Sequence, residues 1–579
     1  MLASLLRPRR RALVVASVVI VVETAASLAG PWLVRLGIDR GIPALVDGRG
    51  TGVIMLVVAA YAAAAVLSAG ANRAFLVLTG RIGQDVLLEL RGRLFAHLQR
   101  LSLAFHERYT SGRVVSRLTS DVDAIAELCQ TGLVTLVAAA LQLVGIAAVL
   151  LLLDLPLGAL TLLVVPAMAV LTRWFRDRSE HAYRATRATV ALVIVQFAES
   201  LAGIRAVHAF GRQARNQQIF EDLNGRYRDA SLWSSRLAAV YGPGQRALGA
   251  VTTAVILAVG GMRVLDGGMT VGVLVAFLLY LRLFFDPMQE LSQFYNVFQS
   301  AAAALEKLSG VLDEQPSVPE PPAPATVALD RPRGQVRFEG VRFAYRRDGG
   351  PPVLDGLDLV VPAGQTLALV GPTGAGKSTI ARLLARLYDP DEGRVLLDGV
   401  DLRHLEDRAL RRAVVMVTQE GFLFSGSVGD NIAFGRPGAS PDEVAEAARA
   451  VGAHDLIAAL PHGYDAQVGR RGARLSAGQR QLVAFARAFL ADPTVLVLDE
   501  ATSSLDIPSE RRAQRALRTL LARRTAVIIA HRLSTVEIAD RVLVVEGGRI
   551  VEDGGPATLV ATGGSYATLH RAWADSLTP

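Results

Sequence analysis

Residues 371–380 read Gly-Pro-Thr-Gly-Ala-Gly-Lys-Ser-Thr-Ile (GPTGAGKSTI), and this stretch decides the fold of the second half of the chain. It follows a short apolar run, Thr366–Val370, and leads into a run typical of a helix, Ile380–Leu387. A strand, a glycine-rich turn and a helix in this order are what the pattern G-x-x-x-x-G-K-[ST] requires. The glycines let the backbone close around phosphate, and the N–H groups at the start of the helix supply positive potential. The stretch therefore predicts a phosphate-binding loop in an α/β domain.

Lys377 and Lys307 are the only two lysines among the 61 basic side chains of the chain. An ammonium group is a compact charge that can reach the β- and γ-phosphates inside a narrow loop, whereas a planar guanidinium is too large and wrongly shaped. Nothing around Lys307 suggests chemistry, but the next residue after Lys377 supplies a hydroxyl suited to Mg²⁺. The residues expected to bind the nucleotide phosphates are Gly371, Thr373, Gly374, Gly376, Lys377, Ser378 and Thr379.

A second segment, Thr494-Val-Leu-Val-Leu-Asp499-Glu500, predicts a buried parallel strand that ends in two carboxylates. Asp499 is expected to orient Mg²⁺, and Glu500 is expected to polarise the attacking water. The alternative, a strand that merely ends in acidic residues, does not account for the loop at 371–379. Together the two segments predict nucleotide hydrolysis.

The first 300 residues differ from the rest by their long apolar runs, and hydrophobic residues make up 51% of the chain. About 20 apolar residues are needed to cross a bilayer as a helix. Runs of this length or more cover residues 12–36, 52–79, 131–153, 156–175, 239–265 and 269–300. We therefore predict a six-span α-helical membrane domain (1–310), a proline-rich linker (311–335) and an α/β P-loop nucleotide-binding domain (336–579). The nucleotide-binding domain is expected to start with two exposed-edge strands, Val336–Gly340 and Val341–Tyr345.

The arginines gather in the two long connections between spans, with seven in residues 81–129 and eleven in residues 173–236. The positive-inside rule places both connections and the soluble domain inside the cell. This distribution also accounts for the net charge of +8 without a nucleic-acid partner. Arg7–Arg11 and the following apolar run resemble a secretory signal peptide. We favour an uncleaved first span, because the apolar pattern continues through residues 32–34, and hence a multi-pass plasma-membrane protein.

Charged residues inside the spans are costly and tend to face a polar cavity or a partner, unless they lie near span ends and reach the interface. They are Glu23, Arg246, Arg282 and Asp286. Asp286-Pro287 also predicts a break or kink, since proline removes a helical donor. The lone cysteine, Cys129, excludes an intrachain disulfide and is expected to be a buried apolar side chain.

Leu475-Ser-Ala-Gly-Gln479, shortly before the Asp499 strand, resembles the signature of ATP-binding cassette (ABC) proteins. A serine and a glycine at a helix N-terminus present hydrogen-bond donors to an anion. The resemblance implies that this anion is the γ-phosphate held by a partner domain, so that two domains clamp two ATP molecules. The signature residues are Leu475, Ser476, Ala477, Gly478 and Gln479.

The same resemblance assigns further roles. It implies that Tyr345 stacks on adenine and that Gln419 senses Mg²⁺ and contacts the membrane domain. It implies that Ser503 and Asp506 communicate across the dimer, and that His531 contacts the γ-phosphate. Two departures are evident: the usual signature has glycine where this chain has Ala477, and Gln467 and Arg470 replace residues that are normally acidic.

The order of six spans, linker and nucleotide domain looks like an exporter-type (type IV) half-transporter with domain-swapped helices. Phe105–Asp123 and Glu199–Phe210 are similar to the two coupling-helix regions of that family. The resemblance implies ATP-driven export of a hydrophobic or amphipathic small molecule, lipid or peptide, with ATP and Mg²⁺, by a homodimer or heterodimer in contact with membrane lipid. A lipid flippase, a siderophore-type importer and a gated channel remain alternatives. The predicted spans argue against a soluble ABC ATPase.

Overall fold

The computed structural model of the chain describes residues 4–5, 7–48, 50–319, 332–345, 350–419, 421–499, 507–530 and 532–575. These residues form two compact units. The first unit comprises residues 1–97 and 114–313, and the second comprises residues 98–113 and 314–579. Residues 98–113, a short piece of the N-terminal half, therefore group with the C-terminal half.

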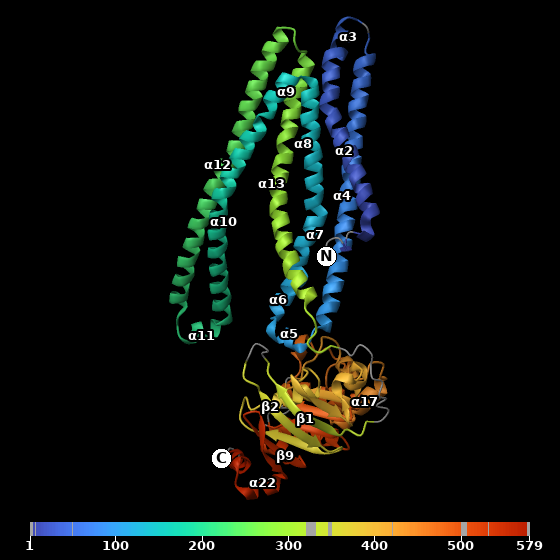
Figure 1. Cartoon of the computed structure of the whole chain (residues 1–579), viewed down its shortest axis with the longest axis vertical. Helices are drawn as coiled ribbons and strands as arrows, with labels where there is room; N and C mark the ends of the chain where they lie inside the picture. The colour runs from blue at the N-terminus through green and yellow to red at the C-terminus, as the bar shows by residue number, and fades with distance from the viewer. Residues whose placement is uncertain are drawn as a thin grey trace. The chain divides into compact units, whose positions relative to one another are not determined.

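The first unit consists of long helices (Figure 1). In the described part of the chain, six helical stretches are long and apolar enough to cross a membrane, which confirms the six predicted spans. The helices that form these stretches are α2 (Arg10–Leu36), α4 (Gly52–Arg100), α8 (Leu133–Leu153), α9 (Leu155–Leu162), α10 (Val164–Ala202), α12 (Gln213–Leu265) and α13 (Val271–Asp313). Shorter elements join them: η1 (Arg7–Arg9), η2 (Gly37–Gly41), α3 (Ile42–Val46), α6 (Ser111–Ser116), η3 (Arg117–Asp121), α7 (Val122–Glu127), η4 (Leu128–Gly132) and α11 (Ile204–Ala209).

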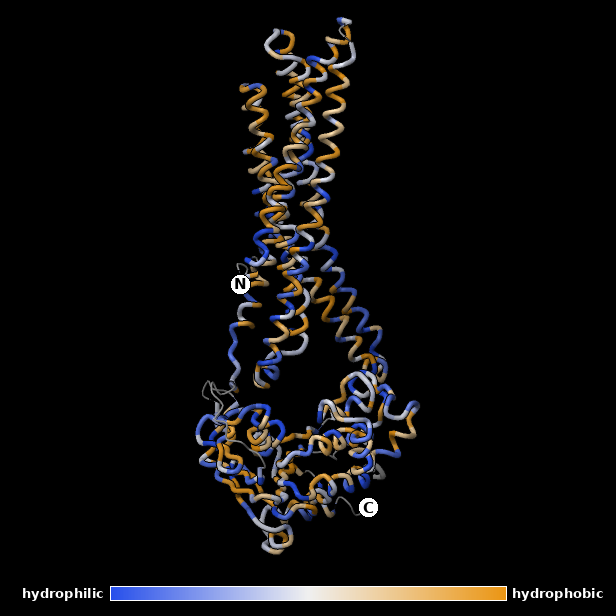
Figure 2. The backbone as a smooth tube through the Cα atoms, turned by 90° about the vertical axis from the view of Figure 1, so that its right-hand side faces the viewer, coloured by the Kyte–Doolittle hydropathy of each residue, from blue (hydrophilic) through white to orange (hydrophobic). Residues whose placement is uncertain are grey.

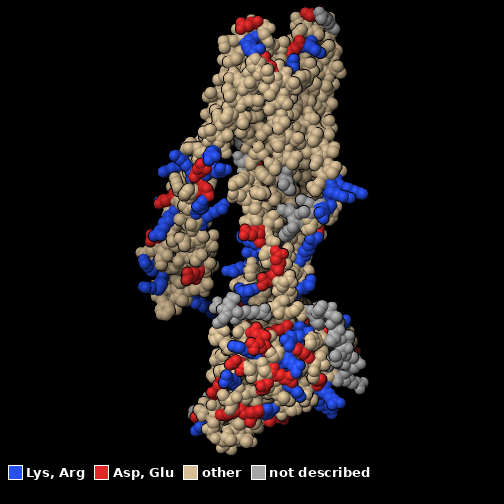
Figure 3. All heavy atoms as spheres, viewed as in Figure 1, with Lys and Arg blue, Asp and Glu red and all other residues tan. Residues whose placement is uncertain are grey.

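Several of these helices are much longer than a bilayer requires. Helices α4 and α12 contain 49 and 53 residues, against the roughly 20 that cross a hydrocarbon core. Figure 2 shows the apolar residues concentrated in one stretch of the bundle, and Figure 3 shows charged side chains along the lower parts of α10 and α12. These two helices pack together through stacked rings of Phe175 and Tyr241, whose centroids lie 4.2 Å apart. The helices therefore continue as a paired extension beyond the apolar band.

Asp39 joins the end of the first span to the start of the sixth. One carboxylate oxygen accepts the backbone N–H of Gly272 at 2.8 Å, and the other accepts the hydroxyl of Thr270 at 2.7 Å. Gly272 is the second residue of α13, so the carboxylate lies at the positive end of that helix. A Cβ on Gly272 would lie 2.5 Å from Asp39 Oδ1 and 2.7 Å from the carbonyl oxygen of Arg35. Glycine is therefore required for this close approach.

Replacing Asp39 by alanine is expected to lower the free energy of unfolding by about 1–2 kcal/mol, because two donors lose a charged acceptor at a helix N-terminus. The measurement is the thermal midpoint of the purified chain in lipid nanodiscs. Asp266→Ala is a matched control, since Asp266 follows the C-terminus of α12 and does not cap a helix N-terminus. Equal midpoints for Asp39→Ala and the unaltered chain would contradict the assignment.

Helix α13 runs without interruption from Val271 to Asp313 and contains Pro287, so a break at that proline is wrong, whereas the alternative that was predicted with it, a kink, stays a prediction. Buried side chains hold the helix on both sides of the proline, with Tyr280 at 0% and Leu308 at 0% exposure. The Tyr280 hydroxyl also donates to the carbonyl oxygen of Leu28 at 2.5 Å. Packing on both sides compensates for the one backbone donor that proline removes.

The charged residues predicted inside the spans lie in different surroundings. Glu23 is partly buried and accepts a hydrogen bond from Ser68 at 3.5 Å, whereas Arg246, Arg282 and Asp286 are exposed in the single chain. Cys129 is buried, as predicted.

The second unit contains two sheets. A four-stranded antiparallel sheet has the order β2-β1-β4-β5, and a six-stranded sheet has the order β10-β9-β3-β8-β7-β6, parallel except for β10. The strands are β1 (Val336–Phe343), β2 (Leu354–Val361), β3 (Thr366–Val370), β4 (Glu392–Leu397), β5 (Val400–Asp401), β6 (Val414–Val417), β7 (Val495–Asp499), β8 (Thr525–Ile529), β9 (Arg541–Glu546) and β10 (Arg549–Gly554). All residues of β3 and β8 are buried, which is why these strands are continuous apolar runs. The predicted α/β nucleotide-domain fold is confirmed.

Helices cover the six-stranded sheet, and one helix from the N-terminal half joins this unit. The helices are α14 (Lys377–Leu384), η5 (Leu402–His404), α15 (Asp407–Ala413), α16 (Val428–Ala433), α17 (Pro441–Ala450), α18 (His454–Ala458), η6 (Gly463–Asp465), η7 (Arg470–Gly472), α19 (Ala477–Ala491), α20 (Ile507–Leu521), α21 (Leu533–Val536), α22 (Pro556–Thr562) and α23 (Ser565–Asp575). The added helix is α5 (Leu103–Arg108), whose Leu103 and Ala104 pack against the core that both sheets share.

The start of this unit differs from the predicted pair of edge strands. Residues 336–343 form one strand, β1, which lies between β2 and β4 and so has no free edge. Its pairing shifts register between Phe338 and Val341, and Gly340 there has φ +54°. The bulge interrupts the alternation of buried and exposed residues along β1, and this interruption made one strand look like two short ones in the sequence. Because β1 pairs with β2 on one side and β4 on the other, it is a central strand.

Candidate nucleotide-binding site

Several strand ends meet at one edge of the six-stranded sheet. Leu369 of β3 pairs with Ile529 of β8, and Ile529 pairs with Asp499 of β7. Strand β6 runs parallel to β7 and ends two residues before Gln419. Because parallel strands end at the same edge, the loop at 371–376, Asp499 and Gln419 all lie along it. The topology thus gathers segments that are up to 128 residues apart in the sequence at a single edge.

The loop after β3 needs glycine for its backbone conformation. Gly371 has φ +138°, and a Cβ there would lie 2.1 Å from the carbonyl oxygen of Val545. Gly376, at the N-cap of α14, has φ +108°, and its Cβ would lie 2.9 Å from a methyl carbon of Leu354. Both positions combine a left-handed backbone with a close neighbour. The loop can therefore fold tightly, with the N-terminus of α14 directly behind it.

Lys377 opens α14 and is only 5% exposed. Its Nζ donates to the carbonyl oxygens of Gly371 at 2.7 Å and Pro372 at 2.8 Å. The ammonium group is therefore held within the loop by the loop's own backbone. Next to it, Ser378 is partly buried and Thr379 is buried, whereas Thr373 and Gly374 at the tip of the loop are exposed.

Tyr345 follows β1 and presents a half-exposed ring beside the loop helix. Its hydroxyl lies 3.1 Å from Thr379 Oγ1 and accepts from Arg382 Nη1 at 3.2 Å. The rings of Phe343 and Tyr388 meet it edge to face, with centroids 5.0 and 5.3 Å away. Tyr345 is thus an aromatic surface fixed from three sides, with its exposed face open to a flat ligand.

The sequence interpretation did not identify Arg382 or Tyr388 as part of this site. Arg382 lies five residues after Lys377 and carried no motif, although its position one helical turn from Thr379 was a usable signal. Tyr388 carried no local signal, because its contact with Tyr345 depends on how β1 and α14 pack together.

The signature segment lies where a helix begins. Ser476 is the N-cap of α19, and its hydroxyl accepts the Gln479 backbone N–H at 3.2 Å while Gln479 Oε1 accepts the Ser476 N–H at 2.8 Å. In this capping box the hydroxyl accepts from the backbone and keeps its own proton for donation. Ser476 is exposed, Ala477 and Gln479 are partly buried, and Leu475 and Gly478 are buried.

Three oxygen-bearing side chains along the sheet edge suit a magnesium ion. They are the hydroxyl of Ser378, the amide of Gln419 and the carboxylate of Asp499, which are the hard ligands that Mg²⁺ prefers. The chemistry of this donor set fits the ion. The other predicted residues of the edge and the dimer loop, namely Glu500, Ser503, Asp506 and His531, lie outside the described residues.

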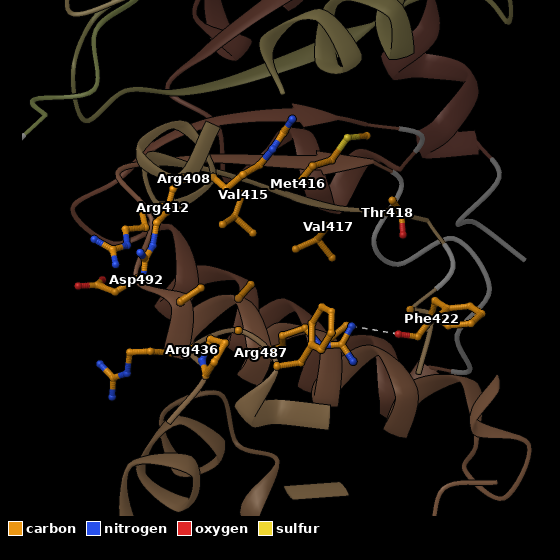
Figure 4. Close-up of a pocket in the computed structure, with 18 of the residues that line it drawn as sticks. Arg408, Arg412, Val415, Met416, Val417, Thr418, Phe422, Arg436, Arg487 and Asp492 are labelled. Atoms are coloured by element: carbon orange, nitrogen blue, oxygen red, sulfur yellow. Dashed lines mark hydrogen bonds between the residues drawn. The ribbon is translucent and has the colours of Figure 1, made fainter. Parts of the chain in front are cut away.

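A separate cleft of about 1260 Å³ lies between α15, β6 and α19 (Figure 4). Exposed rings of Phe422 and Phe434 line it, and the Arg487 guanidinium lies 5.3 Å above the Phe434 ring. Arg487 also donates to the carbonyl oxygens of Phe422 at 3.0 Å and Asn431 at 2.8 Å. Arg408 and Arg412 lie at the opposite wall. The cleft is therefore an aromatic and basic groove of this unit.

Two family profiles match this chain. The one described as ABC transporter transmembrane region matches residues 13–288, and the one described as ABC transporter matches residues 354–503. Each profile covers a different one of the two halves inferred from composition.

Individual proteins are similar over most of the chain. A multidrug efflux ATP-binding/permease protein of Mycobacterium bovis is 40% identical over 580 residues, which cover 99% of this chain and 47% of that protein. The chain thus spans about half the length of that relative. An ATP-dependent lipid A-core flippase of Syntrophus aciditrophicus is 35% identical over 495 residues, or 86% of this chain and 82% of the flippase. The structure of a bacterial Atm1-family ABC exporter with ATP bound matches with a TM-score of 0.80 and 32% identity, over 98% of this chain and 99% of that chain.

These matches agree with the fold and with the site. Six apolar helices precede an ATP-binding α/β domain, and the predicted resemblance to exporter-type half-transporters is confirmed. The chain is a multi-pass inner-membrane protein whose ATP-binding domain is cytoplasmic. By its two profile matches and its relatives, the chain belongs to the ABC transporter family.

Proposed function

We propose that the chain is one half of an ATP-driven exporter that moves a hydrophobic or amphipathic compound by alternating access. The observation that carries this proposal is the position of α5. In sequence this helix belongs to the membrane half, yet Leu103 and Ala104 pack against the core of the ATP-binding unit. A helix shared in this way can transmit rearrangement at the nucleotide site to the membrane helices.

In this proposal ATP binds along the sheet edge with its phosphates on the loop at 371–379 and its base on Tyr345. Ser378, Gln419 and Asp499 hold Mg²⁺, which when bound neutralises charge on the β- and γ-phosphates. Glu500 orients and polarises the attacking water, and His531 contacts the γ-phosphate. The domain limits proposed for this chain are 1–310, 311–335 and 336–579.

The proposed partner is a second half-transporter, either another copy or a related chain. The N-terminus of α19 presents an exposed serine hydroxyl and backbone donors, which suit a γ-phosphate held by that second chain. Residues 475–479 and the loop with Ser503 and Asp506 then lie at the dimer contact. Mass analysis of the chain expressed alone, combined with its ATPase activity, separates a homodimer from a heterodimer.

We propose that α11 of the second chain docks in the aromatic groove shown in Figure 4. The α11 hairpin exposes Ile204 at 44% and Phe210 at 80%, and these apolar side chains suit a groove lined by Phe422 and Phe434. In a Cys129→Ala background, cysteines introduced at Phe210 and Phe434 are expected to give a disulfide-linked dimer on a denaturing gel. A cysteine at Val560 of α22 in place of position 434 is the control and should give no dimer. Only intrachain linkage in the first pair would contradict this docking.

Transport in sealed inside-out vesicles tests the main proposal. Compounds are first screened for stimulation of ATPase activity in lipid, and any stimulating compound is then followed across the membrane. ATP-dependent accumulation inside the vesicles supports export, whereas movement in the opposite direction indicates an importer. Translocation of a labelled lipid identifies a flippase, an alternative favoured by the lipid A-core flippase relative. Ion flux independent of hydrolysis identifies a channel.

A further inference from the structure

Glu107, near the end of α5, contacts two side chains of the ATP-binding unit. Its Oε2 accepts a hydrogen bond from the Tyr388 hydroxyl at 2.5 Å, and its Oε1 lies 3.4 Å from Arg382 Nη1. Tyr388 is 6% exposed, so its hydroxyl has little access to water as an alternative acceptor. Burial raises the pKa of the Tyr388 hydroxyl well above its usual range, and the hydrogen bond to Glu107 raises it further, so Tyr388 remains a donor at physiological pH.

Both partners of Glu107 also contact Tyr345. Arg382 donates to the Tyr345 hydroxyl at 3.2 Å and lies over its ring, with 5.8 Å from Cζ to the centroid. The Tyr388 ring meets the Tyr345 ring edge to face at 5.3 Å. One carboxylate of the membrane half therefore holds two of the side chains that orient the exposed aromatic ring beside the phosphate loop.

Ser102, which precedes α5, and Arg108, at its end, make other contacts in the same unit. Ser102 Oγ lies 2.6 Å from Ser317 Oγ, and Arg108 donates to Glu314 at 2.5 Å. Because these contacts involve residues 314–317 rather than the nucleotide edge, they fix α5 without touching Tyr345. Arg108 is the neighbour of Glu107 on α5 but contacts Glu314, whereas Glu107 contacts Tyr388 and Arg382, so Arg108 is the control for docking of α5.

We propose that Glu107 is a positioning residue that links α5 to the base-stacking face of Tyr345, so that occupancy by the adenine ring and the position of α5 depend on each other. This inference rests on the proposed role of Tyr345. A carboxylate that holds both Arg382 and Tyr388 favours one orientation of the ring, and a bound base favours the same orientation. Thermodynamic linkage then requires that binding of the base stabilises the contact of α5, and that loss of the contact weakens binding of the base.

The test compares two ligands on the full-length chain in nanodiscs. ATP contacts both the phosphate loop and the base-stacking face of Tyr345, whereas inorganic tripolyphosphate contacts the phosphate loop alone. Glu107→Ala is expected to weaken ATP binding about tenfold, within the usual range of coupling between sites, and to leave the Kd for tripolyphosphate unchanged. Glu107→Gln keeps an acceptor for Tyr388 but loses the charge opposite Arg382, so a smaller loss of about threefold is expected. Arg108→Gln is expected to change neither Kd.

Tyr345→Ala separates this inference from the proposal on which it rests. If Tyr345→Ala weakens ATP binding but the Glu107 variants do not, only the link through Glu107 is overturned. If Tyr345→Ala has no effect, the base-stacking role itself fails, and this inference fails with it. Equal weakening of ATP and tripolyphosphate by Glu107→Ala, or an equal effect of Arg108→Gln on ATP, would assign Glu107 to general docking of α5 and overturn the inference. Thermal midpoints of all variants identify any that fail to fold. If Glu107→Ala fails to fold, the Kd values of Glu107→Gln, which preserves the side-chain shape, decide between support and rejection of the inference.

Discussion

Replacing Lys377 by arginine will reduce ATP hydrolysis about 100-fold although the charge of the side chain is unchanged. Lys377 is 5% exposed, and its ammonium group donates to two carbonyl oxygens at 2.7 and 2.8 Å, in a loop whose backbone closes around it. A guanidinium is a wide, planar fork that cannot occupy the same point without opening the loop. Hydrolysis rates at saturating Mg-ATP and the Kd for ATP are the measurements, and Lys377→Ala should be at least as damaging.

Lys307→Arg is the control for this substitution, because it makes the same chemical change at the only other lysine. Lys307 is half exposed and lies 3.8 Å from Asp121, an ion pair that arginine can also form. Its variant is expected to keep the ATPase rate of the unaltered chain. A Lys377→Arg protein with near-normal hydrolysis would show that the loop accepts any cation and would remove the geometric argument.

Replacing Glu500 by glutamine is expected to lower turnover by about 10²- to 10⁴-fold while ATP stays bound. Glu500 follows Asp499 in the sequence, and Asp499 is the last residue of β7, a strand of the sheet that leads into the phosphate loop. Glutamine has the shape of glutamate but cannot take up a proton from the attacking water. A protein that binds ATP without hydrolysing it should accumulate as a closed dimer, because binding favours that state and the reset is blocked.

Single-turnover hydrolysis and molar mass in the presence of ATP measure both parts of this expectation. Glu446→Gln makes the same change at an exposed position on α17 and should alter neither rate nor mass. Undiminished hydrolysis by the Glu500→Gln protein would remove this residue from the proposed mechanism. Loss of hydrolysis without a change in mass would support Glu500 as the residue that acts on the attacking water, but would contradict the accumulation of a closed dimer.

The membrane spans and the phosphate loop were predictable from the sequence because each depends on neighbouring residues. A run of about 20 apolar residues is sufficient to define a span, and all six stretches are found among the described residues. The loop between β3 and α14 requires glycine at fixed spacings, so its conformation is encoded within ten residues. The signature helix was equally readable, since its start at Ser476 is set by a local capping box.

Other features depend on packing between distant segments. A central position for β1 depends on pairing with β4, and the continuity of α13 through Pro287 depends on packing on both sides of the proline. Local sequence patterns contain no information about such partners, which is why the sequence predicted an edge position for β1 and a break or kink at Pro287.

By itself, the sequence determined that six spans precede an ATP-binding domain and that Lys377 lies in its phosphate loop, because hydropathy and turn chemistry act over short stretches. Only the tertiary structure decided which side chains surround Tyr345. Glu107 and Tyr388 are 281 residues apart, yet they meet at 2.5 Å. Their contact depends on α5 packing onto the shared core of the second unit, and no periodicity or motif along the chain records that packing.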